Sequence, residues 1–108
     1  MAADADNHEL LHELQSQVAV AERYGLVLLA NMREALGSLD RIERILKVGG
    51  FVASAPGFND QPKVLDAASN LLGEIFGEAG RHARSAIGVA ELPRNAAVEI
   101  EMTVAYRE

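Results

Sequence analysis

The sequence has 108 residues, of which 49% are hydrophobic and 24% are charged, and its formal net charge is −6. This length and apolar content suit one globular domain and exclude a disordered tail. No run approaches the ~20 apolar residues that a membrane-spanning helix needs, and the first residues are acidic where a secretory signal needs basic ones. Because cysteine is absent, a disulfide framework and a thiolate nucleophile are excluded, and a cytoplasmic location fits.

The acidic residues are concentrated in the first part of the chain. Residues 1–40 carry seven acids and two bases, whereas residues 41–108 carry nine acids and eight bases. No basic stripe is present to follow a phosphate backbone, and five Phe and Tyr residues are too few for base stacking. The composition therefore argues against nucleic acid as a partner.

A long helix is predicted at the start of the chain. Asp6 and Glu9 have the spacing of a capping box, and Gly37 is a plausible stop. Between them, apolar or small residues recur at steps of three and four, which predicts one buried stripe. The stripe consists of Leu11, Leu14, Val18, Ala21, Gly25, Leu28, Met32 and Ala35.

The segment Ile42–Ser54 is ambiguous, because its first part could be helical or extended by pattern. We predict a strand in which Gly49 and Gly50 mark a bulge or a close approach of the backbone. A hairpin turning at the two glycines is the alternative. A loop is predicted over residues 55–59.

A second helix and two strands are predicted in the remainder. Asp60 can cap the helix, Pro62 suits its first turn and Gly80 ends it. Its predicted buried face consists of Val64, Ala68, Leu71, Leu72, Ile75, Phe76 and Ala79. The strands are Ala83–Ala90 and the strictly alternating stretch from Val98 to Arg107. The order helix, strand, helix, strand, strand indicates an α+β fold with both helices on one face of a small sheet. The exposed edges of such a sheet favour oligomerisation.

His8-Glu9-Leu10-Leu11-His12 matches the zinc-peptidase motif H-E-x-x-H. Gln15 and Val18 stand where the metzincin extension needs glycine and histidine, and no third ligand is evident. A solvated first helical turn is the favoured interpretation.

The final strands carry the stronger candidate site. Arg84 lies in an otherwise small and apolar strand, where a guanidinium can form a bidentate pair with a ligand carboxylate. Glu99 and Glu101 project from the polar side of the strand that we expect beside it. Either one of them forms a structural ion pair with Arg84, or the pair lines a cleft where the glutamate orients or deprotonates a water. His82 is more typical of a surface residue than of an acid or base.

From Leu39 to its end the chain resembles the RidA/YjgF family of reactive-intermediate deaminases. The resemblance rests on residues 39–42, 47–54, 58–64 and 76–80, and most strongly on 81–89, Leu92-Pro93 and Val98-Glu99-Ile100-Glu101. It implies a fold like that of Bacillus chorismate mutase, formed by residues 1–108 as a single domain with an N-terminal helix (1–38) and a β-α-β-β core (39–108). It also implies a homotrimer with ligand clefts between subunits.

The activity that the resemblance implies is that of a hydrolase. It would convert small carboxylate-bearing enamines and imines, such as 2-aminoacrylate and 2-iminobutanoate, to 2-oxo acids and ammonia, with no metal or organic cofactor. Arg84, with Ser85 and Ala86 beside it, would bind the substrate, and Glu99 would place the water. Members normally begin with a hairpin and a further strand ahead of the first helix, where this sequence has none. A non-catalytic, oligomeric module that binds small anions is therefore the alternative.

Overall fold

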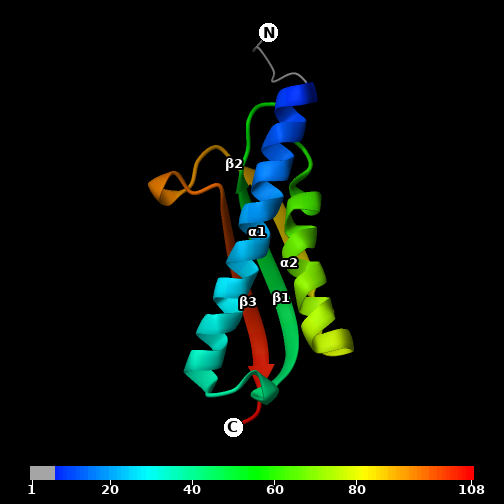
Figure 1. The fold of residues 1–108 in the computed structure, drawn as a ribbon, viewed down its shortest axis with the longest axis vertical. Helices are drawn as coiled ribbons and strands as arrows, with labels where there is room; N and C mark the ends of the chain where they lie inside the picture. Colours follow the sequence, from blue (N-terminus) through cyan, green and yellow to red (C-terminus); the bar gives the residue numbers. More distant parts are fainter. Residues whose placement is uncertain (1–6) are drawn as a thin grey trace.

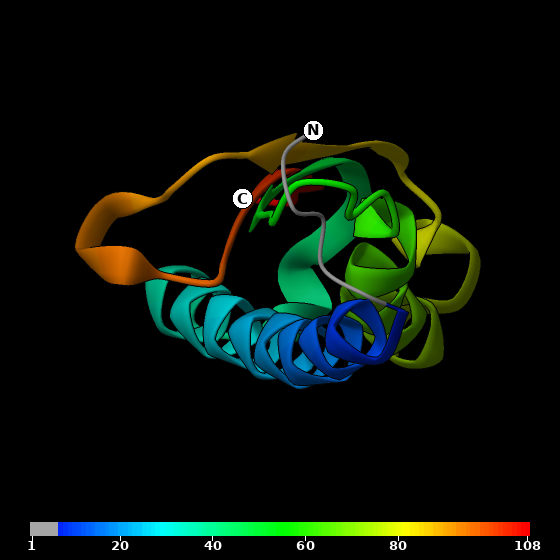
Figure 2. The same ribbon diagram turned by 90° about the horizontal axis from the view of Figure 1, so that it is seen from above.

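The computed structural model describes the backbone of residues 7–108 and the side chains of residues 13–108. Its main elements, in chain order, are α1 (Asn7–Leu36), β1 (Ile42–Ala53), α2 (Gln61–Phe76), β2 (Ala83–Val89) and β3 (Val98–Tyr106). Both helices cover the same face of the sheet (Figures 1 and 2). The predicted α+β fold and its order of elements are thus confirmed. No helix within residues 7–108 combines the length and the apolar character needed to cross a membrane.

The sheet has the order β2-β1-β3, with β2 parallel and β3 antiparallel to β1. The expectation that the last two strands lie side by side is therefore wrong, because β1 separates them. The unit β1-α2-β2 is a parallel crossover that places α2 over β1 and β2. β3 pairs with the other edge of β1 and contacts α1. It thereby provides an apolar surface against which the long apolar stripe of α1 is buried.

Two bulges explain why the first half of β1 resembles a helix in sequence. Ile42, Ile45 and Val48 are all buried, at steps of three rather than two. The pairing with β3 shifts between Ile42 and Arg44 and again between Ile45 and Lys47, so that Glu43 and Leu46 are extra residues. Each extra residue restores the inward direction of the next apolar side chain. The predicted strand is confirmed, whereas the Gly-Gly hairpin and a bulge at that pair are both wrong.

Gly50 is instead the point where α2 approaches the sheet closely. A Cβ atom built at Gly50 would overlap the side chain of Leu65, which is fully buried. At Gly49 the same atom would meet only the flexible Glu101 side chain on the opposite face, 3.1 Å from its Oε1. The predicted close approach is thus confirmed, and Leu65 rather than the half-exposed Ile75 belongs to the buried face of α2.

The helix boundaries agree with the sequence pattern except at the end of α2. This helix stops at Phe76 with Gly77 as its C-cap, and the predicted stop at Gly80 is wrong because residues 77–80 form a separate short helical turn. Gly37, at φ +87°, donates its N–H to the Arg33 carbonyl and ends α1 as predicted. Asp60 stands at the N-cap of α2, but its side chain makes no capping hydrogen bond. The predicted cap of α1, Asp6, lies outside the described residues. Gln17 ties α1 to the sheet, because its amide Nε2 donates to the Ala53 carbonyl at 2.6 Å.

Candidate functional site

Arg84 lies on the helix-covered face of the sheet, beside Val48 in the register of β1 and β2. Its Nη1 donates to Asp66 Oδ1 at 2.8 Å and to Ser69 Oγ at 3.2 Å, and both partners belong to α2. No hydrogen bond joins its Nε or Nη2 to another described residue. The guanidinium is therefore neutralised within its own chain but retains N–H donors that could bind a second anion.

The ion pair with Asp66 is partly solvated. The Arg84 side chain is 24% exposed and that of Asp66 is 53% exposed. An exposed pair of this kind is worth about 0.2–1 kcal/mol, far less than a pair shielded from water. A ligand carboxylate can consequently compete with Asp66 for the guanidinium.

A hollow of about 290 Å³ opens beside Arg84 at the β2 edge of the molecule. It is bounded by α2, the short helical turn Gly77–Gly80 and the start of β2, and its lining residues are Ser69, Gly73, Gly80, Arg81, His82 and Arg84. Arg81 is largely exposed and pairs with Glu78 at 3.3 Å. Gly73 leaves its part of the wall open, since a Cβ there would meet nothing within 4 Å. The hollow combines two arginines with a hydroxyl, which suits a small anion.

Glu99 lies on the opposite, uncovered face of the sheet. The register places it beside Phe51, with Ile87 on the other side of Phe51. Two residues away in the register, Gly49 of β1 pairs with Glu101 of β3 on one side and with Ser85 of β2 on the other, and the Glu101 side chain lies over Gly49. Glu99, Glu101 and Ser85 are exposed and Ile87 is 48% exposed, so this face is open to a ligand or another chain.

One copy of the chain does not bring Arg84 and Glu99 together. They belong to the two outer strands, separated by β1, and their side chains leave opposite faces of the sheet. Ser85 shares the face of Glu99, whereas Ala86 shares that of Arg84 and is half-buried. The anticipated ion pair between Arg84 and a β3 glutamate is absent among the described residues, and Asp66 takes that place.

Asp66 and Ser69 were not identified by sequence reasoning. They stand three residues apart and thus share one face of α2, beside the buried Leu65 and Ala68. This spacing was visible in the sequence. The sequence did not show that this face of α2 contacts Arg84, because that contact depends on the parallel pairing of β1 with β2, which places α2 over Arg84.

The H-E-x-x-H motif stays a sequence observation that the structure does not test. The backbone of residues 8–12 is helical, but the side chains of the H-E-x-x-H motif lie outside the described residues. Within residues 13–108 no group of three histidines or carboxylates is placed to hold a metal ion.

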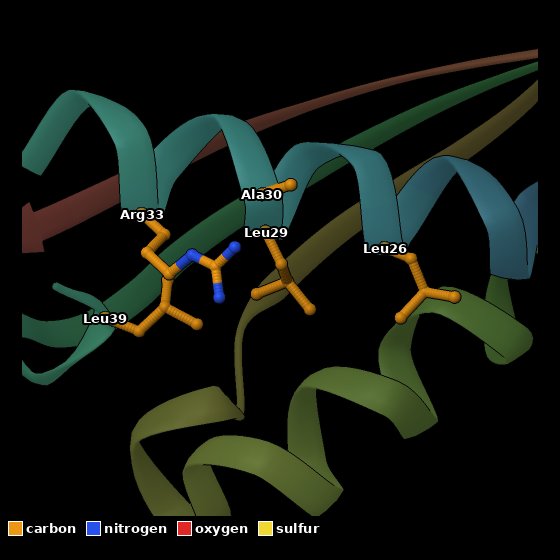
Figure 3. A pocket seen from close by; sticks show the side chains of 5 residues that line it. All are labelled: Leu26, Leu29, Ala30, Arg33 and Leu39. Carbon is orange, nitrogen blue, oxygen red and sulfur yellow. The ribbon is translucent and has the colours of Figure 1, made fainter. Parts of the chain in front are cut away.

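A second hollow, of about 170 Å³, is lined by Leu26, Leu29, Ala30, Arg33 and Leu39 (Figure 3) and includes neither Arg84 nor Glu99.

Comparison with known proteins gives a consistent family match. Residues 11–104 match the family described as "YjgF/chorismate_mutase-like, putative endoribonuclease". The chain is 47% identical over 87 residues to Protein TCP17 of Trypanosoma cruzi, which covers 80% of the chain and 54% of that protein. It is 39% identical over 71 residues to a 2-iminobutanoate/2-iminopropanoate deaminase of Dermatophagoides farinae. This alignment covers 66% of the chain and 48% of that protein. The chain thus spans about half the length of the curated relatives that it matches.

A solved structure shares the fold over the whole chain. The protein Atu1372 of Agrobacterium tumefaciens, whose function is unknown, superposes with a TM-score of 0.85 at 41% sequence identity. The match covers 100% of this chain and 65% of that one. The strand order and the position of both helices are therefore shared with a longer protein.

Proposed function

The chain belongs to the YjgF/chorismate mutase-like family, and we propose that it hydrolyses small carboxylate-bearing imines and enamines to 2-oxo acids and ammonia. The observation that carries the proposal is the position of Arg84, a guanidinium beside a small hollow with donors still available. The name of the Dermatophagoides relative supports the substrate class.

Arg84 would bind the carboxylate of the substrate through its unused N–H groups. A bidentate guanidinium–carboxylate pair fixes the plane of the bound acid as well as its position. Ser69 Oγ, already 3.2 Å from Nη1, could donate to the same carboxylate or to the imine nitrogen. The open wall at Gly73 leaves room for a short side chain of the substrate.

The reaction needs a water and a group that accepts its proton. The water oxygen adds to the imine carbon, the carbon–nitrogen bond then breaks, and ammonia leaves behind a 2-oxo acid. We assign the placement of the water to Glu99, whose carboxylate accepts a proton from the attacking water and returns it to the nitrogen, which then leaves as ammonia. Because Glu99 and Arg84 lie on opposite faces of one sheet, the two must come from different copies of the chain. A trimer whose clefts lie between subunits meets this requirement.

A mixing experiment tests both the reaction and the division of the site between copies. Purified protein should release ammonia from freshly generated 2-iminobutanoate faster than the uncatalysed reaction, and Arg84→Ala and Glu99→Gln should each lose most of that rate. When the two variants are unfolded together and refolded, about a quarter of the sites combine an intact Arg84 with an intact Glu99 from a neighbour. We therefore expect the mixture to recover about a quarter of the wild-type rate.

Two outcomes would contradict this proposal. If the wild-type protein does not exceed the rate without protein, the deaminase assignment is wrong. If the wild-type protein is active but the mixture stays as inactive as either variant, both residues act from the same copy. Glu101→Gln provides the matched control, since Glu101 is an exposed glutamate two residues along the same face of β3.

The separation of Arg84 and Glu99 also favours a second candidate function, a non-catalytic module that binds small anions. Such a protein needs only the guanidinium and the hollow beside it. It would bind a stable 2-oxo acid, such as 2-oxobutanoate, without accelerating imine hydrolysis. Calorimetric titration of wild-type protein and Arg84→Ala with 2-oxobutanoate, beside the ammonia assay, separates the two functions.

Removing the charge of Asp66 should strengthen substrate binding. In Asp66→Asn the substrate carboxylate no longer competes with an exposed ion pair worth about 0.2–1 kcal/mol, so KM should fall by up to about fivefold while kcat is unchanged. The free energy of unfolding should change by less than about 1 kcal/mol. Steady-state kinetics and urea denaturation measure the two effects. Glu74→Gln, on an exposed residue of the same helix, is the control, and a rise in KM for Asp66→Asn would contradict the prediction.

A further inference from the structure

The hollow beside Arg84 is lined by basic side chains, although the chain as a whole is acidic. Arg81, His82 and Arg84 are among its lining residues, and none of its lining residues is an aspartate or a glutamate. The formal net charge of the whole chain is −6. A concave surface that carries one sign of charge raises the local concentration of small molecules of the opposite sign. The hollow therefore attracts a dianion more strongly than a monoanion.

The backbone at Arg81 is held in place from two sides. A Cβ atom built at the buried Gly80 would overlap the Leu72 carbonyl, so the chain passes close against α2 at this point. The Arg81 N–H donates to the Glu78 carbonyl at 3.1 Å, and the Arg81 carbonyl accepts from Arg44 Nη2 of β1 at 3.1 Å. These contacts fix the point from which the Arg81 side chain extends.

The Arg81 guanidinium is free to exchange its partner. Its Nη1 lies 3.3 Å from Glu78 Oε1, and the two side chains are 75% and 83% exposed. An exposed pair of this kind contributes little, because water and salt screen both charges. No hydrogen bond joins the remaining N–H groups of this guanidinium to another described residue. A carboxylate of a ligand can consequently displace Glu78 or share the guanidinium with it.

The two arginines lie at different depths. The Arg84 side chain is 24% exposed and is held by α2, whereas the Arg81 side chain is mostly in solvent. A ligand with two carboxylates can therefore place one at each guanidinium, and a monocarboxylate can occupy only one. The hollow, at about 290 Å³, lies at the lower end of the usual range for ligand pockets, about 300–1,000 Å³. Its size restricts the ligand to a small acid.

We propose that the substrates are imines of small dicarboxylic 2-amino acids, an inference that rests on the function proposed above. Arg84 binds the carboxylate next to the imine carbon, and Arg81 binds the second carboxylate at the end of the substrate side chain. The hydrolysis itself is unchanged. Water adds to the imine carbon, the carbon–nitrogen bond breaks, and ammonia leaves a dicarboxylic 2-oxo acid.

Calorimetric titration with two stable 2-oxo acids tests the second contact. 2-Oxoglutarate and 2-oxopentanoate have the same five-carbon chain and differ in the terminal carboxylate. We expect the wild-type protein to bind 2-oxoglutarate at least about fivefold more tightly, and Arg81→Gln to reduce this preference to below about twofold. Arg84→Ala should weaken the binding of both acids. Equal affinity of the wild-type protein for the two acids would overturn the proposal.

Arg23→Gln provides the matched control. It removes the same charge from an exposed arginine that lines a different hollow, on α1, so the preference for 2-oxoglutarate should be retained. If Arg23→Gln and Arg81→Gln reduced the preference equally, the preference would come from the overall charge and the proposal would be wrong. Inorganic phosphate that binds as tightly as 2-oxoglutarate would also overturn it, because one compact anion would then satisfy the hollow.

Glu78→Gln should have the opposite effect to Arg81→Gln. It removes the carboxylate that competes for the Arg81 guanidinium, so the affinity for 2-oxoglutarate should rise by about two- to fivefold relative to that for 2-oxopentanoate. Both Glu78 and Arg81 are largely exposed, and circular dichroism should show that their variants keep the fold. An unchanged or reduced preference in Glu78→Gln would overturn the assignment of the second carboxylate to Arg81.

Ammonia release from the two corresponding imines separates this inference from the proposed function. We expect kcat/KM for freshly generated 2-iminoglutarate to exceed that for 2-iminopentanoate at least about fivefold, with the same dependence on Arg81. If 2-oxoglutarate is preferred but neither imine is hydrolysed faster than without protein, the deaminase function is wrong and the hollow is a binding site for dicarboxylic acids. If both imines are hydrolysed equally fast and both 2-oxo acids bind equally, the deaminase function stands and the role of Arg81 is wrong.

Discussion

Replacing Arg84 with alanine is expected to lower kcat/KM for 2-iminobutanoate hydrolysis by about 100-fold or more. Loss of a charged, hydrogen-bonded contact to a substrate costs about 2–5 kcal/mol, and each 1.36 kcal/mol corresponds to about a tenfold change in rate. Arg84→Lys should retain part of the activity, because an ammonium attracts the carboxylate but cannot bind it bidentately. The measurement is the initial rate of ammonia release from imine that is generated in the assay.

Arg33→Ala is the matched control for this substitution. Arg33 lines the hollow between α1 and Leu39 (Figure 3), which shares no lining residue with the hollow beside Arg84. Its removal should therefore change kcat/KM by less than about twofold. Urea denaturation should show that Arg84→Ala stays folded, since an ion pair with an exposed partner is worth only about 0.2–1 kcal/mol. A similar loss of activity in Arg33→Ala and Arg84→Ala would show that Arg84 has no special role in substrate binding.

Gly50→Ala and Leu65→Ala are each expected to destabilise the fold, and the double variant less than the sum of the two. Gly50→Ala forces a methyl group into the space of the buried Leu65 and should cost about 1–3 kcal/mol. Leu65→Ala leaves a cavity and should cost about 2–5 kcal/mol. In the double variant the added methyl group occupies part of that cavity, which predicts a favourable coupling of about 1–3 kcal/mol.

Urea denaturation of the four proteins at one protein concentration measures this coupling. Gly49→Ala is the control, because a methyl group there meets only the flexible end of the Glu101 side chain, and the expected cost is below about 1 kcal/mol. Equal destabilisation by Gly49→Ala and Gly50→Ala would mean that the close approach of α2 to the sheet does not limit the residue at position 50.

Local patterns were sufficient to identify every helix and strand except the first half of β1. The stripe of α1, the stop at Gly37 and the alternation of β3 follow from short-range periodicity and backbone geometry, which depend on neighbouring residues only. The first half of β1 could be read as a helix or as a strand, because a pattern of neighbouring residues does not reveal which strand it pairs with. Its two bulges place apolar residues at a spacing of three, and bulges form only against a partner strand, which no local pattern identifies.

The candidate site was predictable in composition but not in arrangement. The sequence and its family resemblance pointed to Arg84 and Glu99, and both lie near open surface, beside a hollow in one case and on an uncovered face in the other. Their expected proximity assumed that β2 and β3 are neighbours. The partner that Arg84 actually contacts, Asp66, is 18 residues away along the chain and is reached only through the parallel crossover.

The sequence by itself determined which segments of this protein are helices and strands, which of their sides are apolar, and where the charged residues stand along them. These properties depend on side-chain chemistry and on the helical and extended repeat distances. Only the tertiary structure decided the strand order and the face on which each charged residue lies. Strand pairing joins residues far apart in sequence, and the chosen pairing is the one that buries the stripes of both helices at the same time.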